Sequence, residues 1–282
     1  MSSSHSNSAR PIGVFDSGVG GLTVLRALQA RLPNESFVYL GDTARLPYGT
    51  KSSASIERYA LQAAAALVRY DIKCLVIACN TASAIALPVL RQRFAPLPVI
   101  GVVEPGADAG CRATRTGRIA VVATESTVRG GAYQAAIAAR RADVQTIARA
   151  CPLFVALAEE GLVDGPIVEA IAHRYLDSVF SGAEIQPDTL VLGCTHFPVL
   201  ASALQKVLGK SVTIVDSAQT TAQALEQILS ETSLLAPLGV TCQLQLLATD
   251  GRDRFSRVGE IFLGSRIASG DVELIDLVDL QS

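Results

Sequence analysis

The chain has 282 residues, which is long enough for one large or two medium domains that each bury a core, and we expect two. Its 24 basic and 26 acidic residues leave a net charge of −2, and no Lys/Arg cluster recurs along one face, so nucleic acid is not an expected partner. Hydrophobic residues make up 49% of the chain, but no run of about 18 apolar residues occurs in it, so we expect no membrane span.

The chain begins with a polar stretch, MSSSHSNSAR, that lacks the apolar segment of a secretory signal. We therefore expect a disordered tail over residues 1–11 and a cytoplasmic location. Short apolar runs then alternate with longer helical patterns, which is typical of βαβ units and a parallel sheet. We expect strands at Ile12–Phe15, Ser36–Leu40, Leu75–Ala78 and Val99–Val102, and helices at Gly21–Leu32, Ala54–Tyr70 and Thr81–Phe94. Pro88 should kink the third helix.

The same alternation then restarts. We expect strands at Arg118–Ala123, Val144–Ile147, Thr189–Leu192 and Val212–Val215, and helices at Val128–Arg141, Pro152–Glu160, Pro166–Phe180 and Pro198–Leu208. A helix near Ala218–Ser230, a strand-like run and a closing amphipathic segment should return to the first half. We predict an α/β protein of two similar doubly wound domains, residues 12–103 plus 217–282 and residues 104–216, with the active site in the cleft between them.

Two of the expected strands end in a thiol that is followed by polar residues, in LVIACNTAS and TLVLGCTHF. Ligands of open α/β sheets bind beyond the carboxyl ends of the strands, so we expect Cys79 and Cys194 on opposite walls of one cleft. A helix N-terminus should lower the pKa of Cys79, and Asn80 and Thr81 add donors for a carboxylate. His196 places an imidazole beside the second thiol.

The six cysteines form no CxxC pair, and without an export signal we expect reduced thiols rather than disulfides. Two of them, Cys74 and Cys79, lie at an odd offset on one strand, so their side chains should point to opposite faces, and we expect no metal site. His173 is best interpreted as a surface residue. The cysteines that we interpret as packing residues are Cys74, Cys111, Cys151 and Cys242.

Two loops follow the first two expected strands. The glycines of DSGVGG let the backbone approach a ligand, and amides at a helix start favour a negative group. The spacing does not match a dinucleotide fingerprint, so Asp16 either serves an ammonium ligand or proton chemistry, or caps its own helix. The second loop, GDTARLPYG, either closes over a small ligand or simply turns the chain.

Two separated thiols that each end a strand limit the reaction. They suit a two-base proton transfer, in which one group removes a proton from carbon and the other returns a proton to the opposite face, as in racemisation or epimerisation. Pyridoxal phosphate chemistry would need a Schiff-base lysine. Lys73, Lys206 and Lys210 are poorly placed for that role and Lys51 stays open, so cofactor-independent chemistry is favoured.

Seven ordered motifs closely resemble the glutamate racemase family of the cofactor-independent aspartate/glutamate racemase superfamily. They are GVFDSGVGGLTV, YLGDTARLPYG, ACNTASA, EPGA, ATESTVRGGAY, LAEEG and LVLGCTHFP. The resemblance implies two α/β domains with the active site between them, often in a homodimer, and interconversion of L- and D-glutamate with no cofactor and no metal. It further implies a supply of D-glutamate for peptidoglycan, and thus a part in cell-wall biogenesis and cell shape.

The resemblance also implies residue roles. Cys79 and Cys194 match the two catalytic thiols, Cys79 acting on D-glutamate and Cys194 on L-glutamate. Asp16 and His196 match groups that assist the thiols, and Glu159 matches a further carboxylate near the second thiol. The positions that match substrate-binding residues are Asp16, Ser17, Tyr48, Gly49, Asn80, Thr81, Thr124, Thr127, Thr195 and His196.

Two rival functions stay open at the level of sequence. Aspartate racemase activity in the same superfamily would depend on the depth of the cleft. A non-catalytic amino-acid-binding protein would bind glutamate without exchanging its α-proton. The expected partners are a small-molecule substrate, glutamate, and a second copy of the chain, and neither nucleic acid nor a membrane.

Overall fold

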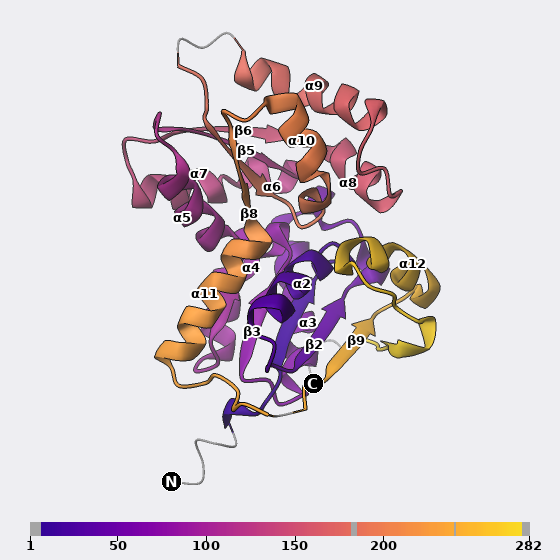
Figure 1. Ribbon diagram of the computed structural model, residues 1–282. Coiled ribbons are helices and arrows are strands. Elements are labelled where there is room, and N and C mark those ends of the chain that lie inside the picture. The colour runs from indigo at the N-terminus through magenta and orange to yellow at the C-terminus, as the bar shows by residue number, and fades with distance from the viewer. Residues whose placement is uncertain (1–6, 182–184, 240, 278–282) are drawn as a thin grey trace.

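Two parallel β-sheets organise the chain into two lobes (Figure 1). The computed structural model describes residues 7–181, 185–239 and 241–277. The sheet of the first lobe has, in spatial order, the strands β10 (Val272–Leu274), β9 (Leu244–Ala248), β2 (Phe37–Gly41), β1 (Ile12–Asp16), β3 (Cys74–Ile77) and β4 (Val99–Gly101). Its helices are α2 (Leu22–Arg31), α3 (Ser53–Val68), α4 (Asn80–Phe94), α11 (Ser217–Glu231) and α12 (Arg252–Leu263).

The second lobe is built in the same way around a smaller sheet. Its strands are, in spatial order, β6 (Gln145–Ala150), β5 (Arg118–Ala123), β7 (Thr189–Gly193) and β8 (Thr213–Asp216). Its helices are α5 (Val103–Ala113), α6 (Glu125–Gly130), α7 (Ala132–Arg140), α8 (Pro152–Glu159), α9 (Pro166–Phe180) and α10 (Ala201–Leu208). Both sheets are parallel with helices on both faces, so the predicted α/β fold class is confirmed.

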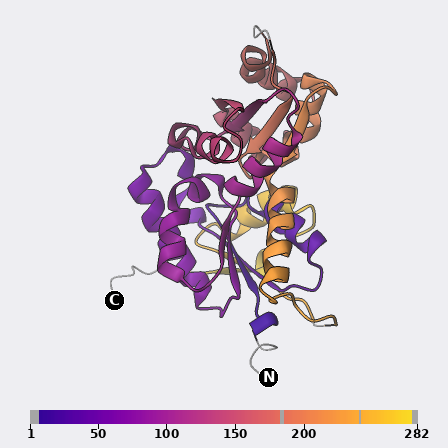
Figure 2. The same cartoon turned by 90° about the vertical axis from the view of Figure 1, so that its left-hand side faces the viewer.

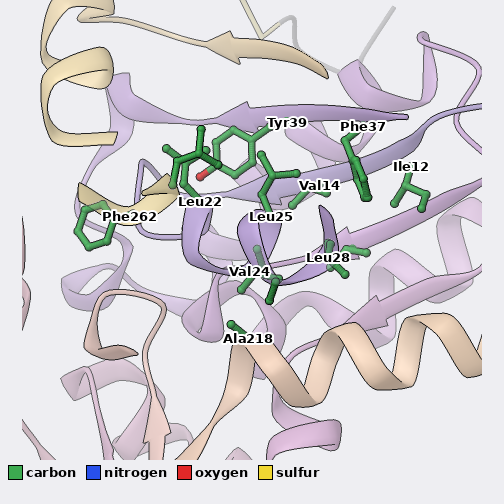
Figure 3. Packing of buried hydrophobic residues seen from close by; sticks show 14 of the residues in the cluster. Ile12, Val14, Leu22, Val24, Leu25, Leu28, Phe37, Tyr39, Ala218 and Phe262 are labelled. Atoms are coloured by element: carbon green, nitrogen blue, oxygen red, sulfur yellow. The ribbon is translucent and has the colours of Figure 1, made fainter. Parts of the chain in front are cut away.

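The central strands are apolar without alternation because both of their faces are covered. Ile12 and Val14 of β1 face a core formed with α2 and α11, whereas Phe15 faces a second core formed with α3 and α4. Figure 2 shows the strands of the first lobe between these two groups of helices. In Figure 3, Leu25 of α2 lies against the sheet, and Ala218 of α11 lies on the far side of α2.

The chain crosses between the lobes at α5 and α11. Val103, Ala107 and Cys111 of α5 pack against the second sheet, and Ala222 and Leu225 of α11 belong to the first core. The domain boundaries at 103/104 and 216/217 stay a prediction.

The helices of the structure differ from the predicted ones at three places. The sequence pattern missed α5, whose Pro105 lies in the first turn, where a missing N–H costs no helical hydrogen bond. The single helix expected at Val128–Arg141 is wrong, because α6 and α7 meet at Gly131, whose φ of +67° favours glycine. The helix expected from Pro198 starts as a 3₁₀ turn, η3 (Phe197–Leu200). Pro88 lies inside α4, and the kink expected there stays a prediction.

The predicted tail over residues 1–11 is too long. Ser8 is buried, and its carbonyl accepts a hydrogen bond from Lys73 Nζ at 2.6 Å. Lys73 also forms a buried ion pair with Glu35, at 2.5 Å. The chain is therefore packed on the first lobe from Ser8 onward, and residues 1–6 of the predicted tail lie outside the described residues.

Within the described ranges, no helix is both long enough and apolar enough to cross a membrane.

Candidate active site

A cavity of about 560 Å³, here called the cleft, opens between the two lobes. Residues that directly follow strands of both sheets line it: Ser17 follows β1, Thr124 follows β5 and Cys194 follows β7. Cavities of about 300–1,000 Å³ are typical of small-molecule sites. The cleft therefore lies where the carboxyl ends of parallel strands place ligands.

Most of the residues predicted for the site meet in the cleft. Those that line it are Ser17, Tyr48, Gly49, Cys79, Asn80, Thr81, Thr124, Glu159, Cys194, Thr195 and His196. Two predicted residues lie just behind its walls. Asp16 is 0% exposed, and the hydroxyl of Thr127 bonds to the hydroxyls of Thr81 and Thr124.

Cys79 caps α4, and its sulfur accepts a hydrogen bond from the Ala82 N–H at 3.5 Å. The thiol in turn donates to Ser17 Oγ at 3.4 Å. Burial, followed by the negative charge of Asp16, raises the pKa of Cys79 to about 12. The predicted lowering of this pKa by the helix N-terminus is wrong, because desolvation of a side chain that is only 5% exposed outweighs the cap. At neutral pH this group is a thiol that can donate a proton.

Asp16 is not the N-cap residue of α2, which is Gly21. Its Oδ2 accepts from the Gly18 N–H at 2.9 Å, whereas α2 begins at Leu22 without a side-chain cap. Burial raises the pKa of Asp16, while the charge of His196 and backbone hydrogen bonds oppose that rise. Its burial and raised pKa suit the acid-base interpretation, while a backbone hydrogen bond from Gly21 also ties the carboxylate to the start of α2.

The second thiol has a different environment. Cys194 follows β7, and its sulfur lies 3.9 Å from Nδ1 of His196, whose Nε2 lies 3.0 Å from Glu159 Oε1. Although burial lowers the pKa of His196, its hydrogen bonds with Cys194 and Glu159 raise it to about 10. The hydrogen bond from His196, helped by Arg254, outweighs burial and lowers the pKa of Glu159 to about 2. An imidazolium therefore lies beside Cys194 at neutral pH.

Gly20 of DSGVGG allows close packing between the lobes, and Gly21 allows close packing within the first lobe. A Cβ at Gly20 would lie 2.6 Å from Thr195 Oγ1 and still closer to His196 Nδ1. A Cβ at Gly21 would lie 2.5 Å from Asp16 Cβ. At Gly20, the group that approaches is the loop of the second thiol, and the expectation that the loop admits a ligand stays a prediction.

Three hydroxyl groups from the two lobes form a cluster at the cleft. Oγ1 of Thr81 in α4 lies 3.0 Å from Oγ1 of Thr124 and 3.2 Å from Oγ1 of Thr127, and the last two lie 3.0 Å apart. Hydroxyl groups can rotate to donate or accept, so the cluster can turn donors toward a carboxylate in the cleft.

The loop GDTARLPYG lines the cleft and touches the second lobe. The Tyr48 hydroxyl donates to Asp42 Oδ2 at 2.6 Å, and Asp42 Oδ1 accepts from Thr249 at 3.0 Å. The Gly49 carbonyl accepts from Ser126 Oγ of α6 at 2.6 Å. The loop is therefore a wall of the site as well as a turn.

Sequence reasoning missed three residues at the site. Tyr133 of α7 accepts a hydrogen bond from Asn80 Nδ2 at 2.8 Å. Arg254 of α12 lines the cleft and bonds Glu159, and Phe262 of α12 meets His196 edge-on with ring centroids 5.0 Å apart. Tyr133 lay in a recognised motif, ATESTVRGGAY, but α12 carried no motif that pointed to these contacts.

The remaining cysteines and the lysines lie elsewhere. Cys74 belongs to the first core and Cys79 to the opposite one. The prediction that both lie on one strand is wrong, because β3 ends at Ile77 and Cys79 caps α4. None of the described residues that line the cleft is a lysine. In the part of the chain that the structure describes, no group of three or more His, Cys, Asp or Glu side chains could hold a metal ion.

A second cavity, of about 580 Å³, lies in the second lobe between α9, α10 and the start of β7. Its lining includes Asp188, whose carboxylate accepts from Thr114 Oγ1 and from the backbone of Arg115 and Thr116. This carboxylate is committed to holding a turn, so the chemistry concentrates in the cleft.

Comparison with known proteins places these features in one family. The family model described as Asp/Glu/Hydantoin racemase matches residues 21–225. Glutamate racemase of Geobacter metallireducens is 47% identical over 95% of this chain and 97% of its own, and that of Chlorobaculum parvum is 43% identical over 98% and 100%. A crystal structure of glutamate racemase from Francisella tularensis in complex with D-glutamate matches with a TM-score of 0.87 at 37% identity, over 96% of this chain and 98% of that one.

Proposed function

The chain belongs to the Asp/Glu/hydantoin racemase family, and from this premise we propose that it interconverts L- and D-glutamate by a two-base mechanism that needs no cofactor. The observation that carries the proposal is that two thiols from the ends of two different strands, Cys79 and Cys194, line one cleft between the lobes. Glutamate is favoured as substrate because curated relatives at 41–47% identity are glutamate racemases.

The proton balance needs both thiols. In the L-to-D direction, the Cys194 thiolate removes the α-proton from one face, and the electron pair stays on the α-carbon beside the carboxylate. The Cys79 thiol then gives its proton to the opposite face, so that Cys194 ends as a thiol and Cys79 as a thiolate. The D-to-L direction runs through the same steps in reverse.

The charges around the thiols support these roles. Cys79, with its pKa of about 12, rests as an acid, and Asp16 beside it is placed to take part when that proton moves. His196, with its pKa of about 10, stays charged at neutral pH and can stabilise a thiolate at Cys194.

The cleft also supports a mode of substrate binding. The Oδ1 atom of Asn80 is buried and finds no donor among the described residues, so it can accept from the substrate ammonium group. The hydroxyls of Thr81 and Thr124 can donate to a carboxylate, together with Ser17 and Thr195. Tyr48, Gly49, Thr127 and His196 complete the proposed binding set.

In the cell, this activity would supply D-glutamate for peptidoglycan, and with it support cell-wall biogenesis and cell shape. We expect a homodimer, as the family resemblance implies, and a cytoplasmic location.

Single-thiol variants test the proposal. Cys79→Ala and Cys194→Ala should each abolish racemisation of glutamate, measured by chiral chromatography, because each removes one of the two bases. Cys111→Ala, which removes a buried thiol on α5 outside the cleft, serves as the matched control and should keep activity. A Cys79→Ala protein that racemises glutamate at the wild-type rate would refute the assignment.

Two rival functions have distinct signatures. An aspartate racemase would turn over aspartate faster than glutamate in the same assay. A non-catalytic binding protein would bind glutamate equally well before and after both thiol substitutions and would never exchange its α-proton.

A further inference from the structure

A chain of three contacts runs from the first lobe to the second thiol. Arg254, on α12 of the first lobe, places Nη2 2.9 Å from Glu159 Oε2, across the cleft on α8. The other oxygen of Glu159 lies 3.0 Å from His196 Nε2, and His196 Nδ1 lies 3.9 Å from the sulfur of Cys194. Each oxygen of this carboxylate therefore has one charged partner.

Glu159 and His196, in the middle of this series of contacts, are more buried than Arg254, so they depend most on keeping their partners. The side chain of Glu159 is 16% exposed and that of His196 8%, whereas that of Arg254 is 51% exposed. An isolated ion pair as exposed as Arg254 would matter little, but here its partner is a nearly buried carboxylate that also holds an imidazole. Without the guanidinium, Oε2 of Glu159 would lose its partner, and the carboxylate would be free to turn away from His196.

Helix α12 contacts the imidazole in a second way. The ring of Phe262 meets the His196 ring edge-on, at 5.0 Å between centroids and 76° between planes. Phe262 holds one side of the imidazole directly, and Arg254 fixes its far nitrogen through Glu159. In Figure 1, α12 lies at the edge of the first lobe that faces α8.

We propose that Arg254 is a positioning residue for the half of the reaction carried out at Cys194: it holds Glu159 so that His196 keeps its orientation toward the thiol, and it makes this arrangement depend on contact between the lobes. The inference rests on the proposed racemase function. It assigns to the C-terminal helix a part in the chemistry of the other lobe.

Isotope effects distinguish this role from a general structural one. Cys194 breaks the α-C–H bond of L-glutamate, and Cys79 breaks that of D-glutamate. If Arg254→Gln slows only the step at Cys194, that step becomes more rate-limiting. With L-[2-²H]glutamate this step breaks the C–²H bond, so the deuterium isotope effect on kcat/KM should rise. With D-[2-²H]glutamate this step follows the cleavage of that bond, so the isotope effect should fall, and the ratio of the two effects should exceed that of the wild type. We expect kcat/KM to fall by about tenfold to a hundredfold, and equally in both directions because the equilibrium constant between enantiomers is 1.

Two further variants sharpen the test. Arg254→Lys keeps the charge but not the fork of donors, and should restore part of the rate and of the isotope ratio. Arg257→Gln removes an exposed arginine from the same helix, and should leave both unchanged. In a Glu159→Gln background, Arg254→Gln should cost little more, because the arginine acts through that carboxylate.

Three outcomes would overturn the inference: isotope effects that change equally for both enantiomers, a rise in KM with unchanged isotope effects, or additive losses in the Glu159→Gln background. The second would make Arg254 a direct contact of the substrate. A wild-type protein that does not racemise glutamate would instead overturn the proposed function, so the two failures are distinguishable.

Discussion

Asn80 shows how one residue in the cleft is oriented by a side chain of the other lobe. Its Nδ2 donates to the buried Tyr133 hydroxyl at 2.8 Å, which leaves the carbonyl end, Oδ1, as the group available to a ligand. An amide can turn over, and this hydrogen bond decides which end faces the cleft. The position of Tyr133 in space, rather than any local pattern, sets this choice, so the sequence indicated Asn80 but not its orientation.

Removing that hydroxyl should weaken substrate binding. A neutral hydrogen bond contributes about 0.5–1.5 kcal/mol, so we expect Tyr133→Phe to raise KM for glutamate by roughly 2- to 12-fold with a smaller change in kcat. Steady-state kinetics with both enantiomers measure this. Tyr70→Phe, which changes a half-buried tyrosine in the turn after α3 and outside the cleft, is the control and should match the wild type. An unchanged KM for Tyr133→Phe would show that the amide needs no such support.

The pair formed by Glu159 and His196 should also give stability a defined pH dependence. The pKa of Glu159 is lowered from its ordinary value of 4.5 to about 2, so its contribution is present above pH 4.5 and is lost as the pH falls toward 2. The pKa of His196 is raised from 6.5 to about 10, so its contribution is present below pH 6.5 and is lost as the pH rises toward 10. The pair should stabilise the fold most between pH 4.5 and 6.5.

Urea unfolding of the wild type and of Glu159→Gln checks this window. We expect the difference in unfolding free energy to be about 1.5–3 kcal/mol near pH 5.5 and to shrink toward both pH 3 and pH 10. A difference that stays constant over this range would contradict the assigned protonation states.

At the level of elements, the loop DSGVGG and the loop that carries Cys194 fit together because Gly20 has no side chain. Gly20 leaves room for His196, and the hydroxyl of Thr23, in the first turn of α2, donates to the Thr195 carbonyl at 2.8 Å. The glycine-rich pattern indicated close approach correctly, but only the structure identifies the group that approaches. The loop thus helps to set the position of the imidazole.

Gly20→Ala should therefore misplace His196. The added methyl group would overlap the imidazole and the Thr195 hydroxyl, so we expect kcat/KM to fall by about tenfold or more, with the fold retained by circular dichroism. Gly130→Ala is the matched control, because a Cβ at that position in α6 meets nothing within 4 Å. Equal activity in the two variants would contradict the role given to this loop.

The elements that sequence periodicity predicted well are those whose signal is local. Arg118–Ala123 and Pro166–Phe180 were predicted with their observed bounds, because a buried strand and an amphipathic helix each carry their own pattern. The expected helix at Val128–Arg141 failed at Gly131, whose left-handed conformation no periodicity reports. Helix α5 was missed because its glycines lower helix propensity, whereas packing against β7 stabilises it.

For the whole molecule, sequence alone led to two thiols on the walls of one cleft, because strand ends of parallel sheets meet at one edge. It could not give the pKa of Cys79, which burial decides, nor the contact of Arg254 with Glu159, which joins residues 95 positions apart. Both depend on how the lobes lie against each other. Glutamate as the substrate rests on the family resemblance and on the similarity to glutamate racemases.

The central claim, that two thiols act on opposite faces of one carbon, is tested most directly by racemisation of L-glutamate in deuterated water, followed by mass spectrometry at low conversion. Our account requires that the D-glutamate formed carries one deuterium at the α-carbon, since its new proton comes from Cys79, while recovered L-glutamate keeps its protium. D-glutamate that retains the original protium, or L-glutamate that gains deuterium as fast as D-glutamate appears, would show that a single base serves both faces.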